Sequence, residues 1–332
     1  MKAPMNLSPI LTGFFTERLM SQRQASHHTI SAYRDTFRLM LHYAKKTLNK
    51  EPSCLSLEDI DASFVSDFLN YLEHERRVKA STRNLRLAAI RSFFRYAAYE
   101  VPDCAEQIQR VLAIPEKRVT KTQLEYLSRT EVAALLAAPD KTTWSGRRDY
   151  AWLMLTIQTG LRVSELTSLK RDDLNLGVGS YIHVTGKGRK ERCTPLTKET
   201  GKIMRTWIKE IPNGKEQVLF PNCRGRQLSN DGIQYLLRKH TKAASQQCVA
   251  LQRKRISPHT LRRTTAMDLL QSGVDTSVIA LWLGHESIET THIYLEANLA
   301  MKEQILAKMS PHKGRLNTFK PDDPLLGFLQ AL

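Results

Sequence analysis

Two scarcities in this sequence of 332 residues exclude whole classes of protein. The chain has no run of about 18 apolar residues, the minimum for a membrane-spanning helix, and its first residues lack the apolar segment of a signal peptide. Its five cysteines are odd in number and none forms a CxxC pair, which argues against a disulfide framework and against a zinc site. We therefore expect a protein of a reducing cytoplasm, with no membrane association and no bound metal or other cofactor.

Acidic residues are also few relative to basic ones. The chain has 33 Asp and Glu against 50 Lys and Arg, a formal net charge of +17. A solvated basic surface is the ordinary interpretation, but an excess this large in a folded chain favours a polyanionic partner, nucleic acid above all. No stretch is typical of a basic amphipathic membrane anchor. Residues 1–114 carry 16 basic and 12 acidic residues and the remainder 34 and 21, so most of the excess lies in the second part.

The first 100 residues contain four stretches in which apolar residues recur at close to 3.6 positions, the period of amphipathic helices. These predicted helices lie at approximately 7–20, 30–48, 61–77 and 81–97. Four such helices with short connections favour a small bundle. The length of the chain leaves room for a second domain after it.

The fourth predicted helix carries a basic series with no acidic residue before Glu100. Its members are Arg83, Arg86, Arg91 and Arg95. A solvated helix face is one interpretation of this series. Together with the motifs described below, we favour phosphate contacts along a DNA groove.

Residues 101–125 differ from their neighbours, because Pro102 and Pro115 interrupt them and their second half is basic and polar. Such a composition is typical of a linker, and its basic residues could follow a DNA backbone. These residues are Lys117, Arg118 and Lys121. We divide the chain into an N-terminal domain at 1–114, a linker at 115–126, a second domain at 127–310 and a tail at 311–332. The apolar end of the tail packs either on its own domain or on a neighbouring subunit.

The second domain is predicted to be mostly helical with a small sheet. Ser128 and Glu131 have the spacing of a capping box, and a helix at 147–159 ends at Gly160, a residue suited to a helix C-cap. Two short strands, 181–184 and 193–196, flank a basic hairpin that contains glycine. Further helices are expected near 199–210, 229–244, 260–271, 275–283 and 297–309.

The second domain also contains every group needed to break a phosphodiester with a side-chain nucleophile. Two guanidiniums can hold the non-bridging oxygens and neutralise the charge that grows in the transition state. A tyrosine hydroxyl can form a covalent ester that is later attacked in reverse, and the leaving 5′ oxygen needs a proton donor. The residues that supply these parts are Arg162, Lys187, His259, Arg262, His285 and Tyr294.

Each of these residues has an ordinary structural interpretation when it is taken alone. Arg162 with Glu165 three positions later is a common helix ion pair, and Lys187 in a glycine-containing hairpin is usually solvated. The residues Gly186 to Gly188 do not have the glycine spacing of a P-loop. His285 after Gly284 could cap a helix, and a tyrosine among apolar neighbours is usually a core residue. What favours catalysis is their joint occurrence in this order.

Five segments in that order resemble the signatures of the tyrosine recombinase, or phage integrase, family, and are most similar to those of its Xer-type and integron- or transposon-borne members. The segments are Gly160-Leu161-Arg162-Val163-Ser164-Glu165-Leu166, Gly186-Lys187-Gly188-x-Lys190-Glu191-Arg192, His259-x-x-Arg262, Leu283-Gly284-His285, and Tyr294 nine residues after His285. Each piece alone is weak evidence, but the ordered set is specific and covers both domains.

The resemblance implies a mainly α fold with a small antiparallel β-sheet, in which a four-helix SAM-like DNA-binding bundle precedes the catalytic domain. It implies that Arg162 and Arg262 clamp the scissile phosphate while Tyr294 attacks it. Lys187 would protonate the leaving 5′-hydroxyl, His259 would assist proton transfer, and His285 would stabilise the transition state. Glu165 would orient the Arg162 loop as an accessory residue. Arg189, Lys190 and Arg192 of the hairpin are expected to contact DNA.

The family also implies double-stranded DNA with a specific site as the substrate, a 3′-phosphotyrosyl intermediate and a Holliday junction. Four protomers would act on two sites, with accessory DNA-bending proteins as further partners, in the bacterial cytoplasm on the nucleoid. The chain departs from many relatives by having Arg263 where they have His, and in a longer tail, which leaves subunit docking open. Two alternatives remain at this point: a DNA-binding accessory protein without activity, and an enzyme like the type IB topoisomerases.

Overall fold

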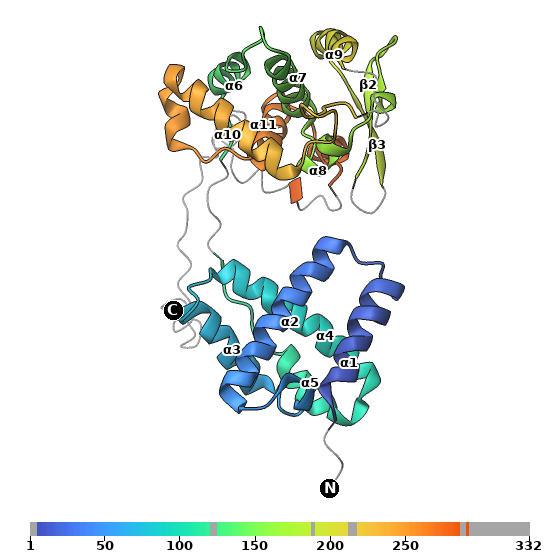
Figure 1. The fold of residues 1–332 in the computed structure, drawn as a ribbon, viewed down its shortest axis with the longest axis vertical. Coiled ribbons are helices and arrows are strands. Elements are labelled where there is room, and N and C mark those ends of the chain that lie inside the picture. The colour runs from blue at the N-terminus through green and yellow to red at the C-terminus, as the bar shows by residue number, and fades with distance from the viewer. Residues whose placement is uncertain (1–4, 120–124, 187–189, 212–217, 286–289, 292–332) are drawn as a thin grey trace, which may run out of the picture. The chain divides into compact units, whose positions relative to one another are not determined.

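The computed structural model describes residues 5–119, 125–186, 190–211, 218–285, 290 and 291. The chain divides into two compact units, Met1–Thr122 and Gln123–Leu332. Each has its own hydrophobic core, and each is described by itself (Figure 1). In the part of the chain that is described, no helix has the length and apolar character that crossing a bilayer requires.

The first unit is a bundle of helices whose starts are set by capping side chains. Its elements are α1 (Leu7–Gly13), a π-helix that continues it (Phe14–Gln22), α2 (His27–Leu48), α3 (Ala62–His74), α4 (Ala80–Glu100) and α5 (Ala105–Leu112), with single 3₁₀ turns at Pro52–Cys54 and Pro102–Cys104. Asn6, Ser26 and Asp61 each accept a backbone N–H at the start of α1, α2 and α3.

The four helices predicted for this unit are confirmed, and α5 is an addition. The sequence indicated a linker there because α5 has only eight residues. Two of them, Ile108 and Val111, are buried, which is too short a pattern to show a helical period. The helix exists because those two side chains enter the core that α3 and α4 already form.

Aromatic side chains fill the centre of the first unit. Phe14, Phe37 and Phe93 come from the π-helix, α2 and α4, and are buried. Their ring centroids lie 5.3–6.1 Å apart at steep angles, the edge-to-face geometry that aromatic pairs favour. The bundle is therefore held by contacts between residues far apart in sequence, such as Phe14 and Phe93, which are 79 positions apart.

The second unit contains seven helices among its described residues, together with a three-stranded sheet. They are α6 (Arg129–Ala137), α7 (Trp144–Thr159), α8 (Val163–Ser168), β1 (Leu174–Asn175), β2 (Tyr181–Thr185), β3 (Glu191–Pro195), α9 (Lys198–Glu210), α10 (Asn230–Gln247), α11 (Pro258–Gln271) and α12 (Thr276–Leu283), with 3₁₀ turns at Arg171–Asp173 and Val249–Arg253. The helix expected at 297–309 lies outside the described residues.

Most expectations for this unit are confirmed by the structure. The capping box of Ser128 and Glu131 is present, and α7 ends at Gly160 with a left-handed φ of 67°. The two predicted strands pair as an antiparallel hairpin, with Val184 opposite Arg192. The short elements α8 and β1 were not predicted, because six and two residues show no measurable period.

Helix α7 forms the middle of this unit, since it contacts α6, α9 and α11 (Figure 1). Nine of its residues are buried, among them Trp152, the largest fully buried side chain in the described protein. Because α7 is enclosed in this way, the turn that follows it at Gly160 has a well-defined position. That turn leads directly into the candidate site.

A network of buried polar side chains joins α7 to α10. Oδ1 of Asp149, a residue only 2% exposed, accepts hydrogen bonds from Arg148 and Trp152. Its Oδ2 lies 2.8 Å from Nε2 of His240, 91 positions away. Burial favours a raised pKa for Asp149, but the bond to His240 and the charge of Arg148 outweigh it and lower the pKa. No sequence pattern predicted this network, because its members are brought together only by folding.

Candidate active site

Arg162 and Glu165 form a compact pair at the start of α8. Gly160 turns the chain out of α7, Arg162 stands at the N-cap position of α8, and Glu165 is the third helical residue. Oε2 of Glu165 accepts the backbone N–H of Arg162 at 2.9 Å, and Oε1 accepts Nη1 of the same residue at 2.8 Å. The helix pair that the sequence left open is therefore present, and it orients the Arg162 guanidinium.

Glu165 is buried, with 4% of its surface exposed. Burial by itself would raise the pKa of its carboxyl group. The hydrogen bonds and charges of Arg192 and Arg162 outweigh that effect and hold the pKa below its ordinary value. Glu165 is therefore a permanent carboxylate at neutral pH.

Arg262 lies beside Arg162 although the two residues are 100 positions apart in sequence. Arg262 is on α11, is 5% exposed, and donates from Nη1 to the Gly160 carbonyl at 2.8 Å and from Nη2 to the Leu283 carbonyl at 2.6 Å. Nη2 of Arg162 donates to the Gly284 carbonyl at 2.8 Å. Because Leu283 and Gly284 are consecutive, the two guanidiniums are held side by side at the end of α12.

Two glycines make this arrangement sterically feasible. Gly160 and Gly284 both have left-handed backbone conformations, with φ of 67° and 65°. A Cβ at Gly160 would lie 2.5 Å from Cδ2 of Leu283, and a Cβ at Gly284 would lie 3.0 Å from Nη1 of Arg192. Glycine is needed here for close approach as well as for backbone conformation.

His259 and His285 both lie in the positive field of these arginines. Partial burial, and then the charges of Arg263, Arg262 and Arg162, lower the pKa of His259. Burial, followed by the charges of Arg262, Arg162 and Arg192, lowers the pKa of His285 to about 4. Both imidazoles are therefore neutral at pH 7, and Nδ1 of His285 lies 2.8 Å from Oγ1 of Thr291.

Four of the six predicted catalytic residues, Arg162, His259, Arg262 and His285, are thus brought together, along with the accessory Glu165. Lys187 and Tyr294 lie outside the described residues, and so does Arg189 of the predicted DNA-binding set. Their assignments stay predictions. Lys190 is exposed, as a residue that contacts DNA must be.

Arg192 has a different environment from the one expected of a DNA contact. Its Nη1 and Nη2 donate to the two oxygens of Glu165 at 3.1 and 2.8 Å, and its Nε donates to the Trp282 carbonyl at 3.2 Å. Only 11% of its side chain is exposed. The prediction that Arg192 contacts DNA is therefore not supported, because its donor nitrogens already have partners inside the unit.

The basic residues predicted on α4 also differ among themselves. Arg83 is 6% exposed and donates to the Pro115 carbonyl at 2.9 Å. This burial argues against the predicted phosphate contact of Arg83. Arg86 donates to the Ala32 carbonyl and to Thr36 on α2, and Arg91 donates to the Ile114 carbonyl and to Glu116. Arg95 is exposed.

The predicted linker residues are partly tied to the first unit. Backbone groups of Lys117 bond the side chain of Asn84, and Nζ of Lys117 lies 2.6 Å from Glu73. Arg118 is exposed, whereas Lys121 lies outside the described residues. Asn84 and Glu73 were not singled out in the sequence, and no local pattern would have identified them.

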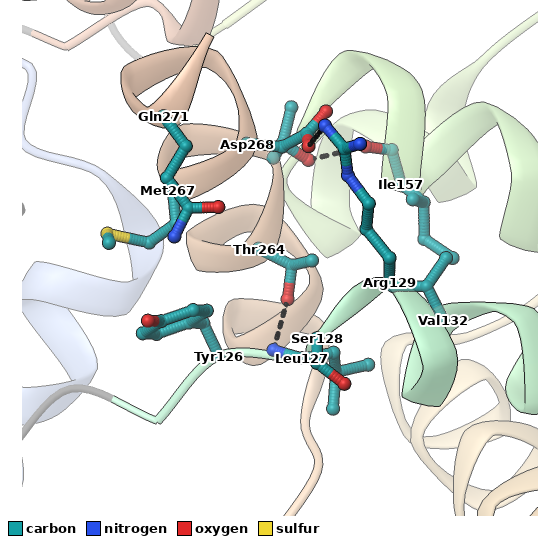
Figure 2. A pocket seen from close by; sticks show the side chains of 11 residues that line it. Tyr126, Leu127, Ser128, Arg129, Val132, Ile157, Thr264, Met267, Asp268 and Gln271 are labelled. Carbon is teal, nitrogen blue, oxygen red and sulfur yellow. Dashed lines mark hydrogen bonds and ion pairs between the residues drawn. The ribbon is translucent and has the colours of Figure 1, made fainter. Parts of the chain in front are cut away.

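A separate hollow of about 430 Å³ opens on another face of α11 (Figure 2). Oγ1 of Thr264 accepts the backbone N–H of Leu127 there at 2.9 Å, and Arg129 lies 3.5 Å from Asp268. At about 100° per residue, Thr264 lies about 160° and Asp268 about 120° around α11 from Arg262. Among the described residues, the lining of the hollow includes none of the predicted catalytic side chains.

Comparison with known proteins identifies the class to which this fold and site belong. The sequence profile of the Phage integrase family matches residues 125–301, and that of the N-terminal SAM-like domain of phage integrases matches residues 14–100. The chain belongs to the phage integrase family, and it is a site-specific tyrosine recombinase.

Individual relatives resemble the chain over nearly its whole length. A Sinorhizobium fredii protein described as an integrase/recombinase, y4rC, is 58% identical over 98% of both chains. The tyrosine recombinase XerD of Pseudomonas putida is 32% identical over 90% of this chain and 96% of its own. A crystal structure of the XerH recombinase bound to a palindromic difH substrate has the same fold, with a TM-score of 0.67 and 22% identity over 86% of this chain and 81% of that chain.

Proposed function

We propose that the chain cuts and rejoins double-stranded DNA at a specific site through Tyr294, with Arg162 and Arg262 binding the scissile phosphate. The observation that carries this proposal is the pair of consecutive carbonyls, Leu283 and Gly284, which hold the two guanidiniums side by side. Two adjacent guanidiniums match the two non-bridging oxygens of a phosphodiester. They also provide positive charge where negative charge grows as the nucleophile attacks.

The two histidines fit roles that need a neutral imidazole. A histidine that is neutral at pH 7 can accept a proton or donate a hydrogen bond without adding charge. His259 would assist removal of the Tyr294 proton, and His285 would bond the phosphate in the transition state. Lys187 would protonate the leaving 5′ oxygen. The product would be a 3′-phosphotyrosyl ester and a free 5′-hydroxyl, and the ester would keep the energy needed for rejoining.

The wider assembly also belongs to this proposal. Solved relatives are described as bound to DNA, for example XerH on its difH substrate and a lambda integrase dimer on a COC′ core site. We propose that this chain likewise binds duplex DNA, acts as a tetramer on two sites and forms a Holliday junction. Exposed basic residues, Arg95, Arg118 and Lys190 among the described ones, would contact phosphates. Accessory DNA-bending proteins and action on the bacterial nucleoid are further parts of the proposal.

A covalent-capture experiment tests the chemistry without knowledge of the DNA site. The protein is incubated in EDTA with a pool of nicked duplexes of randomised sequence, in which a cut strand loses a short end and cannot be rejoined. Adducts that resist detergent are isolated, and their DNA is sequenced. We expect wild type to enrich a defined sequence, and Tyr294→Phe to form no adduct.

Two results would contradict the proposal. An adduct that persists in Tyr294→Phe would place the nucleophile at another residue. Binding of a defined sequence with no adduct from wild type would favour an accessory DNA-binding protein instead.

A further inference from the structure

Arg192 occupies an unusual position for a basic residue of a DNA-binding hairpin. It lies on β3, opposite Val184 of β2, yet its side chain points into the unit and is only 11% exposed. Arg162, by comparison, is 27% exposed. Three nitrogens of Arg192 are used by two acceptors, the carboxylate of Glu165 and the carbonyl of Trp282. A guanidinium bonded in this way serves the protein interior.

The carboxylate of Glu165 accepts hydrogen bonds from two arginines, which bond it with different groups. Arg162 uses its backbone N–H and Nη1, whereas Arg192 uses Nη1 and Nη2 in a bidentate pair. A carboxylate prefers a bidentate guanidinium partner. Among the described residues, the other guanidinium that bonds Glu165 is that of Arg162, so without Arg192 it would be available for that geometry. Arg162 would then turn both Nη atoms to Glu165 and release the Gly284 carbonyl.

Arg192 also supports the chain segment that holds both phosphate-binding arginines. Its Nε donates to the carbonyl of Trp282. Trp282 directly precedes Leu283 and Gly284, whose carbonyls bond Arg262 and Arg162. Its side chain packs against Gly284, where an added Cβ would lie 3.0–3.3 Å from Nη1, Cδ and Cζ of Arg192. Arg192 therefore contacts both the acid that orients Arg162 and the peptide that orients Arg162 and Arg262.

We propose that Arg192 is a positioning residue, which occupies the bidentate side of Glu165 and thereby keeps the Arg162 guanidinium beside that of Arg262 for the scissile phosphate. The inference rests on the proposed function of Arg162 and Arg262. It replaces the expectation that Arg192 contacts DNA. Loss of the Arg192 guanidinium should therefore weaken charge neutralisation at the scissile phosphate and leave DNA binding largely intact.

The test compares cleavage of two substrates by Arg192→Met. One is a nicked duplex of the sequence enriched by wild type from the randomised pool. The other carries a neutral methylphosphonate at the scissile position, which lacks the charge that the two arginines neutralise. Arg162→Ala is the reference, and Arg205→Met is the matched control. Arg205 is an exposed residue of α9 that bonds the Leu176 carbonyl near the sheet and does not contact Glu165.

We expect Arg192→Met to release the 5′-hydroxyl strand of the ordinary duplex about 100-fold more slowly than wild type, the size of effect seen when a transition-state donor is lost. Its affinity for DNA should stay within about threefold, because many phosphates share the binding. On the methylphosphonate the defect should shrink to less than about tenfold, as it should for Arg162→Ala. Arg205→Met should match wild type on both substrates.

Three results would overturn the inference. An equal defect on both substrates would mean that Arg192 only stabilises the fold. A loss of affinity in step with cleavage, with a weaker salt dependence of binding, would mean that it contacts a phosphate. Wild-type cleavage by the variant would mean that it has no role. If wild type itself forms no Tyr294-dependent adduct, the proposed function fails first and removes the premise.

A second variant covers the case in which Arg192→Met does not fold. Arg192→Lys keeps a positive charge beside Glu165 but cannot form the bidentate pair and also bond Trp282. We expect it to fold, with a thermal midpoint near that of wild type. It should show the same selective relief on the methylphosphonate, and an Arg192→Lys enzyme as active as wild type on the ordinary duplex would refute the inference.

Discussion

The two units use buried and half-buried arginines for different purposes. On α4 of the first unit, Arg83 and Arg91 donate to the carbonyls of Pro115 and Ile114. In the second unit, Arg162 and Arg192 share the carboxylate of Glu165. In the first case the arginines hold a chain segment in place. In the second case an acid and a chain segment hold the arginines in place.

The difference follows from the acceptors. A single carbonyl bonds one donor of a guanidinium, whereas a buried carboxylate can bond two at once and adds charge to the interaction. Two carbonyls that bond both Nη atoms, as Gly160 and Leu283 do for Arg262, also fix its direction. Burial first, and then the charges of the neighbouring arginines, lower the pKa values of His259 and His285, so the arginines of the second arrangement still act on the site. Internal hydrogen bonds therefore do not by themselves disqualify an arginine from binding a phosphate. What matters is whether the N–H donors that those bonds do not use point towards the phosphate.

The largest expected effect is on Arg162. Arg162→Ala should lower the rate of adduct formation by about 10²–10³-fold, because a preorganised donor to the transition state is lost. Affinity for the duplex should change by less than about threefold, since binding is spread over many phosphates. Single-turnover cleavage and a filter-binding titration measure the two quantities. Equal losses of cleavage rate and of DNA affinity would mean that Arg162 acts only as a binding residue, with no special role at the scissile phosphate.

The next effect tests the turn that holds Arg262. Gly160→Ala combines a left-handed φ of 67° with a contact at 2.5 Å to Leu283, and should cost about 3 kcal/mol in the free energy of unfolding. Gly179→Ala is the matched control, because its φ is 72° but nothing lies within 4 Å of the added Cβ. It should cost about 1 kcal/mol.

Tryptophan fluorescence during denaturation isolates this effect. The chain has four tryptophans, and all of them lie in the second unit. They are Trp144, Trp152, Trp207 and Trp282. Equal costs for Gly160→Ala and Gly179→Ala would show that close approach at Gly160 is unimportant.

A smaller effect separates structural from DNA-binding arginines on α4. Arg83→Met should destabilise the first unit by about 1–3 kcal/mol, because the Pro115 carbonyl and Oδ1 of Asn84 lose a charged donor. The change should be visible in circular dichroism but absent from tryptophan fluorescence, and the salt dependence of DNA binding should not change. Arg95→Met should leave stability unchanged and reduce the slope of log affinity against log salt by about 0.9, the value for one phosphate contact. A smaller salt slope for Arg83→Met, or a loss of stability for Arg95→Met, would contradict the structure.

The smallest effect concerns the state of His285. Its ordinary pKa of 6.5 is lowered to about 4 by burial and by the neighbouring arginines. Because the folded protein resists this protonation and the unfolded chain does not, stability from this group should fall as the pH drops from 6.5 towards 4, with no change above 6.5. An NMR titration of the DNA-free protein should show an imidazole signal, absent in His285→Gln, that does not shift between pH 8 and 6. A midpoint near 6.5 would show that the arginines do not act on it.

Much of the fold could be predicted because its long elements have strong periods. Helices α2, α3, α4, α7 and α10 each show enough turns for the apolar stripe to be visible. The short elements α5, α8 and β1 could not be found in this way. Their formation depends on contacts with other elements, since α5 packs against α3 and α4, α8 contacts α10, and β1 pairs with β2.

The site was predicted in part, and for a different reason. Arg162, His259, Arg262 and His285 were found because they resemble an ordered family pattern, and the structure brings all four together. DNA contact was expected of Arg192 because it belongs to a basic hairpin, and the structure gives its donor nitrogens partners inside the unit instead. Its acceptors, Glu165 and Trp282, are 27 and 90 positions away.

The sequence by itself thus determined the family, the presence of two helical parts and four of the residues that meet at the site, Arg162, His259, Arg262 and His285. Residue types and spacings along the chain are enough for these, since they reflect local periodicity and chemistry. Only the tertiary structure decided which arginines face inward and which acceptor holds each of them. A guanidinium takes its role from the partners within about 3 Å of its nitrogens, and in this protein many of those partners lie far away in sequence.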